Sequence, residues 1–229
     1  MNVGCIVRIA ALTALVLPLG SAQAIDFRFR PHTVRNYDGD SVDYYFKHQT
    51  SRIFYRVPLP WTWEDSSTEF VARPPLPSRG RLVIQAMPPF PTLPPPGTKE
   101  GIEAYRKHFA EHMPAGSSDV QEIDAQVEKL GGRELPATRA TFSYSWGGRP
   151  RGQTVIYAVL RPDLWLVIRI DSLKEDFSSV NAAALRSLEG FTEEIPSASP
   201  NNESRAANYS SANDTTRQQQ VIVSGAPVS

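Results

Sequence analysis

Three consecutive strand-like segments constrain the fold of this chain most. Residues 140–146, 153–160 and 164–172 either alternate between apolar and polar side chains or run apolar throughout, as residues of strands do. The turns that join them are short, Gly147-Gly148-Arg149-Pro150 after the first and Arg161-Pro162-Asp163 after the second. Because short turns join neighbouring strands into hairpins, we expect two successive hairpins and hence an antiparallel sheet.

Further strands are expected before these hairpins. Segments rich in β-branched and aromatic residues lie at 53–57, 69–72 and 81–87. The ordered domain is therefore expected to begin near Arg52. Residues 25–51, which are polar and typical of loops, are expected to form an N-terminal extension in which 42–46 is an edge strand.

Two other segments have the periodicity of amphipathic helices. The first follows the capping residue Thr98 and stops at Pro114, with an apolar residue every three or four positions. The second runs from Phe177 to Leu188 and is terminated by Gly190.

Residues 120–130 have helical spacing too, so a helix and a strand both stay open there. The whole pattern predicts an α+β domain over residues 52–195, with a central, mostly antiparallel β-sheet flanked by helices.

Four short motifs occur in a recognisable order. They are Val57-Pro58-Leu59-Pro60-Trp61, Gly132-Arg133-Glu134-Leu135-Pro136-Ala137, Ile156-Tyr157-Ala158-Val159-Leu160 and Ser187-Leu188-Glu189-Gly190-Phe191. With the order of elements around them, they make residues 52–191 resemble the PsbP and Mog1-like fold. The resemblance implies a central antiparallel sheet flanked by helices and a binding or accessory role, since the known relatives are mostly non-catalytic. It supplies no active-site motif.

The first 24 residues have the features of a secretory signal peptide. Arg8 gives a positive start, an apolar run from Ile9 to Leu19 follows, and Ala22 and Ala24 stand at the two positions that signal peptidase recognises. We expect cleavage after Ala24. The apolar run is too short to span a bilayer core of about 30 Å, and no second run follows, so we expect no transmembrane segment in the mature chain.

The composition of the mature chain favours a bacterial periplasm. The only cysteine, Cys5, lies in the leader, so the mature chain forms no disulfide. Arg8 is the leader's one charged residue, which leaves 23 basic and 24 acidic side chains and a net charge of −1. That balance argues against a nucleic-acid partner, because phosphate binding needs an excess of Lys and Arg.

Residues 196–229 are rich in Ser, Asn, Ala and Gln, and we expect a disordered tail. It holds three sequons, at Asn202, Asn208 and Asn213, which would be glycosylated only on a eukaryotic secretory route.

One motif, from His108 to His112, has the residue types of a catalytic zinc site. His108 and His112 stand one helical turn apart and could ligate zinc, with Glu111 as the general base of an H-x-x-E-H arrangement. The motif resembles that of the pitrilysin-like inverted zinc peptidases, in which Glu189 would be the third ligand. The position of the two histidines argues against a zinc site. Both lie beside the apolar stripe of their helix, among charged neighbours, as residues on a solvent-exposed helix face do.

The leading interpretation is therefore an exported, periplasmic, non-enzymatic binding or accessory protein. We expect no cofactor, and the expected partner is another exported protein. A zinc-dependent peptidase or hydrolase is the alternative.

Overall fold

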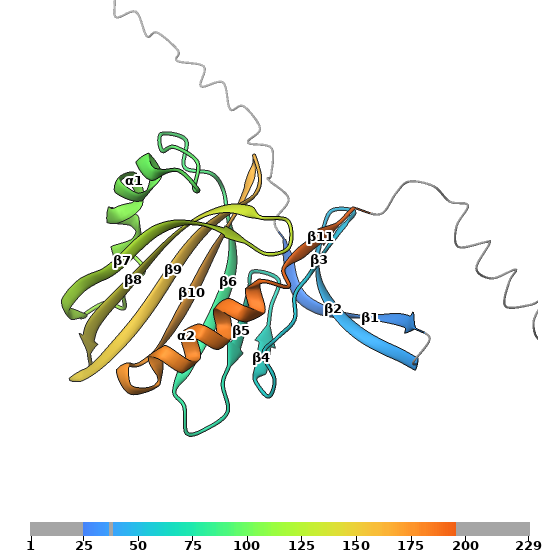
Figure 1. Cartoon of the computed structure of the whole chain (residues 1–229), viewed down its shortest axis with the longest axis horizontal. Coiled ribbons are helices and arrows are strands. Elements are labelled where there is room, and N and C mark those ends of the chain that lie inside the picture. Colours follow the sequence, from blue (N-terminus) through green and yellow to red (C-terminus); the bar gives the residue numbers. More distant parts are fainter. Residues whose placement is uncertain (1–24, 37–38, 196–229) are drawn as a thin grey trace, which may run out of the picture.

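The computed structural model describes residues 25–36 and 39–195, which form eleven strands and two helices (Figure 1). The strands are β1 (Asp26–Asn36), β2 (Gly39–His48), β3 (Ser51–Phe54), β4 (Thr62–Asp65), β5 (Glu69–Arg73), β6 (Gly80–Met87), β7 (Ser118–Leu130), β8 (Leu135–Trp146), β9 (Arg149–Arg161), β10 (Leu164–Leu173) and β11 (Thr192–Glu194). The helices are α1 (Lys99–Ala110) and α2 (Lys174–Leu188). The predicted signal peptide, with Ala22 and Ala24, and the predicted tail from residue 196 lie outside the described residues.

Seven strands form a large antiparallel sheet in the order β4-β5-β6-β10-β9-β8-β7. Its centre consists of the two predicted hairpins, β8 with β9 and β9 with β10. The first hairpin turns through Gly147 and Gly148, which both have positive φ. The expected α+β fold with an antiparallel central sheet is confirmed.

The two helices cover opposite faces of this sheet, because alternate residues of a strand face opposite ways. In β9, Val155 and Tyr157 pack with Tyr105 and Phe109 of α1. The intervening Ile156 belongs to a second core. The buried residues of α2, which are Val180, Ala184 and Leu188, pack in that second core.

Local sequence signals fix both helices. The Thr98 hydroxyl accepts a hydrogen bond of 3.0 Å from the Gly101 N–H and caps α1 as predicted. The helix ends at Ala110, one turn before Pro114. A Cβ at Gly152 of β9 would lie 2.3 Å from the ring of Phe177, so this glycine lets α2 approach the sheet closely.

A second, four-stranded antiparallel sheet of order β1-β2-β3-β11 stands beside the large one (Figure 1). Its inward side chains share one core with the large sheet and α2. The rings of Phe27 and Phe46 are 5.2 Å apart, and Phe46 lies 5.2 Å from Phe70 of β5. Aromatic contacts therefore join the two sheets.

Residues 25–51 thus differ from the expected loop-like extension. They include both strands of the hairpin β1–β2, and Ile25, Phe27 and Phe46 are at most 1 % exposed. The alternation that buries every second residue is hidden in the sequence by outward-facing polar residues such as Arg28.

Residues 120–130 belong to strand β7, at the edge of the large sheet. Val120, Ile123 and Val127 are 43 %, 63 % and 38 % exposed, so their helical spacing marks no buried face.

Among the described residues, no helix is long and apolar enough to cross a membrane.

The hairpin's part in the core can be tested by Phe27→Ala. We expect a loss of about 3–5 kcal/mol in the free energy of unfolding, since the substitution leaves a cavity in the core that both sheets share. Urea denaturation measures it. The control is Val42→Ala in β2, where the side chain is 51 % exposed, with an expected loss under about 1 kcal/mol. Equal losses would show that the hairpin is not part of the domain's cooperative core.

Candidate functional site

The two histidines of the H-x-x-E-H motif have different surroundings. His108 lies in the last turn of α1, stacked on Phe90 with ring centroids 4.5 Å apart. Its Nδ1 lies 3.0 Å from a carboxylate oxygen of Glu111. The C-cap residue of α1 is Glu111, so His112 lies beyond the helix.

His112 is held against the large sheet. Its Nε2 shares a 2.7 Å hydrogen bond with the Tyr157 hydroxyl, and its carbonyl oxygen accepts a 3.2 Å bond from the Gln153 side-chain amide. Burial, with a smaller effect of the positive charge of Arg169, lowers the pKa of His112 to about 4. A buried imidazole with a tyrosine partner holds the end of the α1 segment on β9.

The motif therefore does not assemble the predicted zinc site. Glu189, the predicted third ligand, caps the end of α2 and lines a groove that neither His108 nor His112 lines. Within residues 25–36 and 39–195, no group of three or more His, Cys, Asp or Glu side chains could hold a metal ion. The i, i+4 spacing failed as a predictor because α1 ends between the two histidines.

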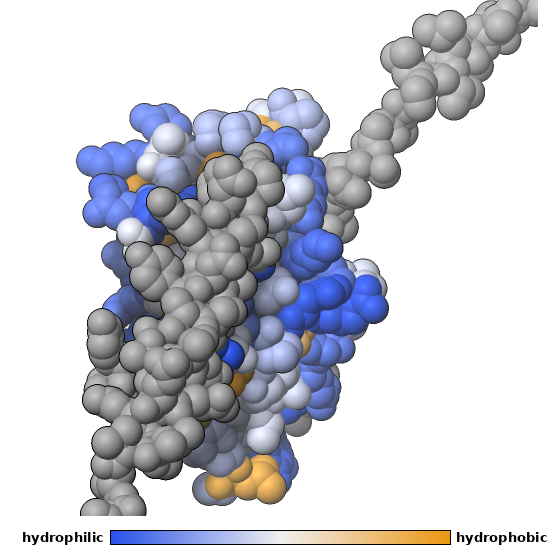
Figure 2. Space-filling view, turned by 90° about the vertical axis from the view of Figure 1, so that its right-hand side faces the viewer, coloured by the Kyte–Doolittle hydropathy of each residue, from blue (hydrophilic) through white to orange (hydrophobic). Residues whose placement is uncertain are grey.

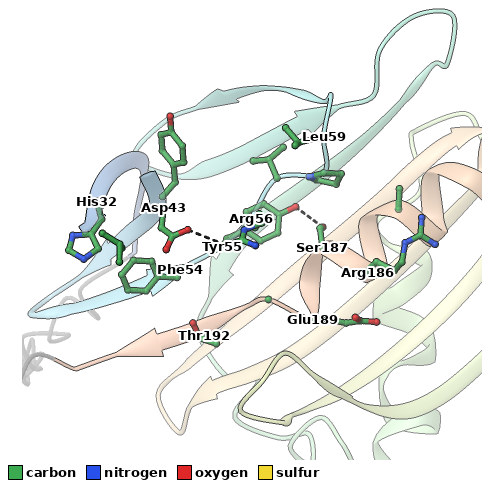
Figure 3. A pocket seen from close by; sticks show the side chains of 16 residues that line it. His32, Asp43, Phe54, Tyr55, Arg56, Leu59, Arg186, Ser187, Glu189 and Thr192 are labelled. Carbon is green, nitrogen blue, oxygen red and sulfur yellow. Dashed lines mark hydrogen bonds and ion pairs between the residues drawn. The ribbon is translucent and has the colours of Figure 1, made fainter. Parts of the chain in front are cut away.

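That groove is a candidate binding site in the described part of the chain (Figure 3). It has a volume of about 970 Å³ and opens to solvent between the small sheet and the C-terminal end of α2. Strands β1, β2 and β3, the loop at residues 55–59, the end of α2 and β11 all contribute side chains.

The wall of the groove is fixed by a hydrogen bond between distant segments. The Tyr55 hydroxyl lies 2.9 Å from the hydroxyl oxygen of Ser187 in α2. Because Ser187 donates its own proton to the Ala184 carbonyl at 2.6 Å, Tyr55 is the donor. Burial raises the pKa of Tyr55 well above its usual range, so the phenol stays protonated and keeps this bond.

The rim of the groove carries both signs of charge and one bare apolar side chain. Arg56 and Asp43 form an exposed ion pair of 3.2 Å (Figure 3), and Arg186 of α2 and its C-cap residue Glu189 also line the groove. Leu59 is 95 % exposed. Figure 2 shows that the visible described residues on the side carrying the small sheet are mostly hydrophilic.

Comparisons with known proteins give similarity in structure alone. No family model matches the chain, and no curated protein matches its sequence. Among solved structures, it is similar to LpqN of Mycobacterium tuberculosis, a protein involved in cell envelope biogenesis, at 18 % identity and a TM-score of 0.49, with 73 % of this chain and 92 % of LpqN covered.

Two further similarities concern the predicted fold. Mog1p, a Ran-binding protein of Saccharomyces cerevisiae, is 13 % identical with a TM-score of 0.40, over 73 % of this chain and 96 % of Mog1p. Cyanobacterial PsbP from Synechocystis sp. PCC 6803 is 10 % identical with a TM-score of 0.35, over 78 % of this chain and 95 % of PsbP. Mog1p and PsbP are thus among the solved structures to which this chain is similar, and they carry the two names of the predicted resemblance.

Sequence reasoning singled out only part of the groove. Leu59 lies in the Leu-Pro-Trp corner and Glu189 in the closing motif, but neither was expected to line a site with the other. Tyr55 and Ser187 are 132 positions apart and belong to no motif. Only the packing of α2 against the small sheet brings them together.

The depressed pKa of His112 predicts a pH-dependent stability. Its value of about 4 in the folded chain lies below the 6.5 of an unperturbed histidine. The unfolded chain therefore binds the extra proton between about pH 6.5 and 4, and stability falls as the pH falls through this window. Allowing for partial solvent exposure, the loss is about 1–2 kcal/mol.

His112→Gln should flatten this part of the stability profile, measured by urea denaturation at several pH values. The matched control His108→Gln should keep the wild-type slope. An unchanged slope in His112→Gln would contradict the assignment.

Proposed function

We propose that this chain is an exported, periplasmic, non-enzymatic binding or accessory protein that holds a segment of a partner protein in the groove between the small sheet and α2. The observation that supports this proposal is the groove itself, a preformed concave site with a volume of about 970 Å³. Its wall is fixed in the free protein by the Tyr55–Ser187 hydrogen bond. A preformed site loses less conformational entropy on binding than a flexible one.

The chemistry of the lining favours a polypeptide. Two arginines, Arg56 and Arg186, oppose two carboxylates, Asp43 and Glu189, so the lining is balanced in charge. The rim carries charges of both signs, and aromatic side chains lie between them. Such a lining is complementary to a neutral, partly apolar polypeptide segment, whose backbone groups are polar. Leu59, free of cover, supplies the apolar anchor.

The start of the folded domain supports export. Ile25 directly follows the predicted cleavage residue Ala24, and its side chain is 1 % exposed in the shared core. Cleavage at this point would keep Ile25 and the other core residues of the described part of the chain. The near-neutral, cysteine-free mature chain is suited to a periplasm.

Export predicts a defined processing event. When the full chain is expressed in a bacterium with a periplasm, the mature protein in that fraction should begin at Ile25, as measured by intact mass. Ala22→Asp and Ala24→Asp should leave the chain unprocessed, because small residues are required at these two positions. Gln23→Asp, between them, should be processed normally. Normal processing of the Ala24→Asp variant would contradict the assignment.

Binding in the groove predicts a local effect of Leu59. Peptides selected for binding from a displayed library should bind Leu59→Asp at least about tenfold more weakly, since a leucine buried on binding contributes about 1.5–3 kcal/mol. Fluorescence polarisation of labelled peptides measures the affinity. The matched control is Ile123→Asp, which changes a 63 % exposed apolar side chain of β7 outside the groove. Selected peptides that bind both variants equally would show that the groove is not their site.

A further inference from the structure

A second pocket, of about 650 Å³, is lined by four arginines. It lies where the loop between β5 and β6 meets the ends of β8, β9 and β10, and it shares no lining residue with the groove. Arg73, Arg79, Arg81 and Arg151 face it, and Asp171 is its only acidic lining residue. These residues come from the strands β5, β6, β9 and β10 and from the loop between β5 and β6.

Asp171 fixes two of the arginines. Its carboxylate, only 9 % exposed, accepts a 2.6 Å bond from Arg81 Nε and a 2.7 Å bond from an Nη atom of Arg151. One carboxylate thus joins β6, β9 and β10 and holds both guanidinium groups in a defined geometry. Positions fixed in advance are what a binding site for a small anion requires.

Both arginines keep unused donors. Each guanidinium has five N–H groups, and Asp171 takes one from each. Arg151 Nε is buried without a hydrogen-bond partner. The same guanidinium lies 5.8 Å from the ring centroid of Trp146, an exposed lining residue that supports it from the side.

The remaining carboxylates leave the pocket positive. Glu64 lies 3.6 Å from Arg73, but its side chain is 74 % exposed, so this pair is weak. Asp176 accepts a bond from the backbone N–H of Arg79. The pocket is lined by four arginines and one carboxylate, so its lining carries a net positive charge.

We infer that this pocket binds an oxyanion, a phosphate or sulfate group, through Arg79, Arg81 and Arg151. Guanidinium donors reach the pocket from a loop and two strands, and such convergence suits a tetrahedral group with an acceptor on every side. Trp146 and Leu76, both exposed in the lining, would contact the rest of a molecule that bears the group. This inference is independent of the groove.

The test uses the purified protein with inorganic phosphate and with sulfate, measured by isothermal titration calorimetry at constant ionic strength. We expect one saturable site. Arg79→Gln and Arg81→Gln should each weaken binding about tenfold, because a hydrogen bond to a charged group contributes about 1.5–3 kcal/mol. The matched control Lys47→Gln removes one positive charge from an exposed position of β2 and should bind like the wild type.

A second arm distinguishes a free group from a lipid headgroup. Phosphatidylcholine vesicles with and without phosphatidic acid are tested for co-sedimentation of the protein. Binding that Arg79→Gln weakens, in either arm, supports the inference. Absence of binding in both arms overturns it, and so does binding that Arg79→Gln and Arg81→Gln leave unchanged. Arg79 does not contact Asp171 through its side chain, so its variant separates anion binding from folding.

Discussion

The aromatic junction between the two sheets determines most of what this fold presents to solvent. Phe46 contacts Phe27 in its own sheet and Phe70 in the large one, each at 5.2 Å between ring centroids. Tyr55 adds to this cluster at 5.6 Å from Phe70 and 6.2 Å from Phe191. Because these rings are buried, the small sheet has a fixed position beside α2, and the groove is the space left between them.

The same junction gives Tyr55 two functions in the structure. Its ring packs in the core, and its hydroxyl reaches Ser187 at the end of α2. A buried phenol without a partner would destabilise the fold, and the Ser187 hydroxyl supplies that partner. Residues 55–59 therefore leave the core at a fixed point, which places Arg56 and Leu59 on the rim.

Sequence patterns predicted elements more reliably than their contacts. Hairpin turns and the Thr98 cap depend on neighbouring residues, and both were found as expected. The spacing of apolar residues in β7 left helix and strand open, because an edge strand with one packed end buries few of them. The hairpin β1–β2 was missed, since its alternation holds arginines on the outer face and is weak as a signal.

Neither candidate site could have been derived from the sequence, for a common physical reason. The groove depends on Tyr55 and Ser187, and the arginine pocket on Arg81, Arg151 and Asp171, which meet only through strand pairing and helix packing. The motif from His108 to His112 could be recognised because its residues are close in the sequence. Since α1 ends at Ala110, the two histidines do not lie on one helix. Spacing within one element predicts a site only when the element continues across it.

Helix α2 lines the groove and is hydrogen-bonded to one residue of the arginine pocket. Near its start, Asp176 accepts a bond from the backbone of Arg79 at the arginine pocket, and near its end Ser187 accepts one from Tyr55 in the groove. Its inner face is packed against the large sheet through Val180, Ala184 and Leu188, each at most 3 % exposed. A helix packed so closely moves as a rigid body or not at all. The same closely packed helix thus contributes one hydrogen bond near each of the two sites.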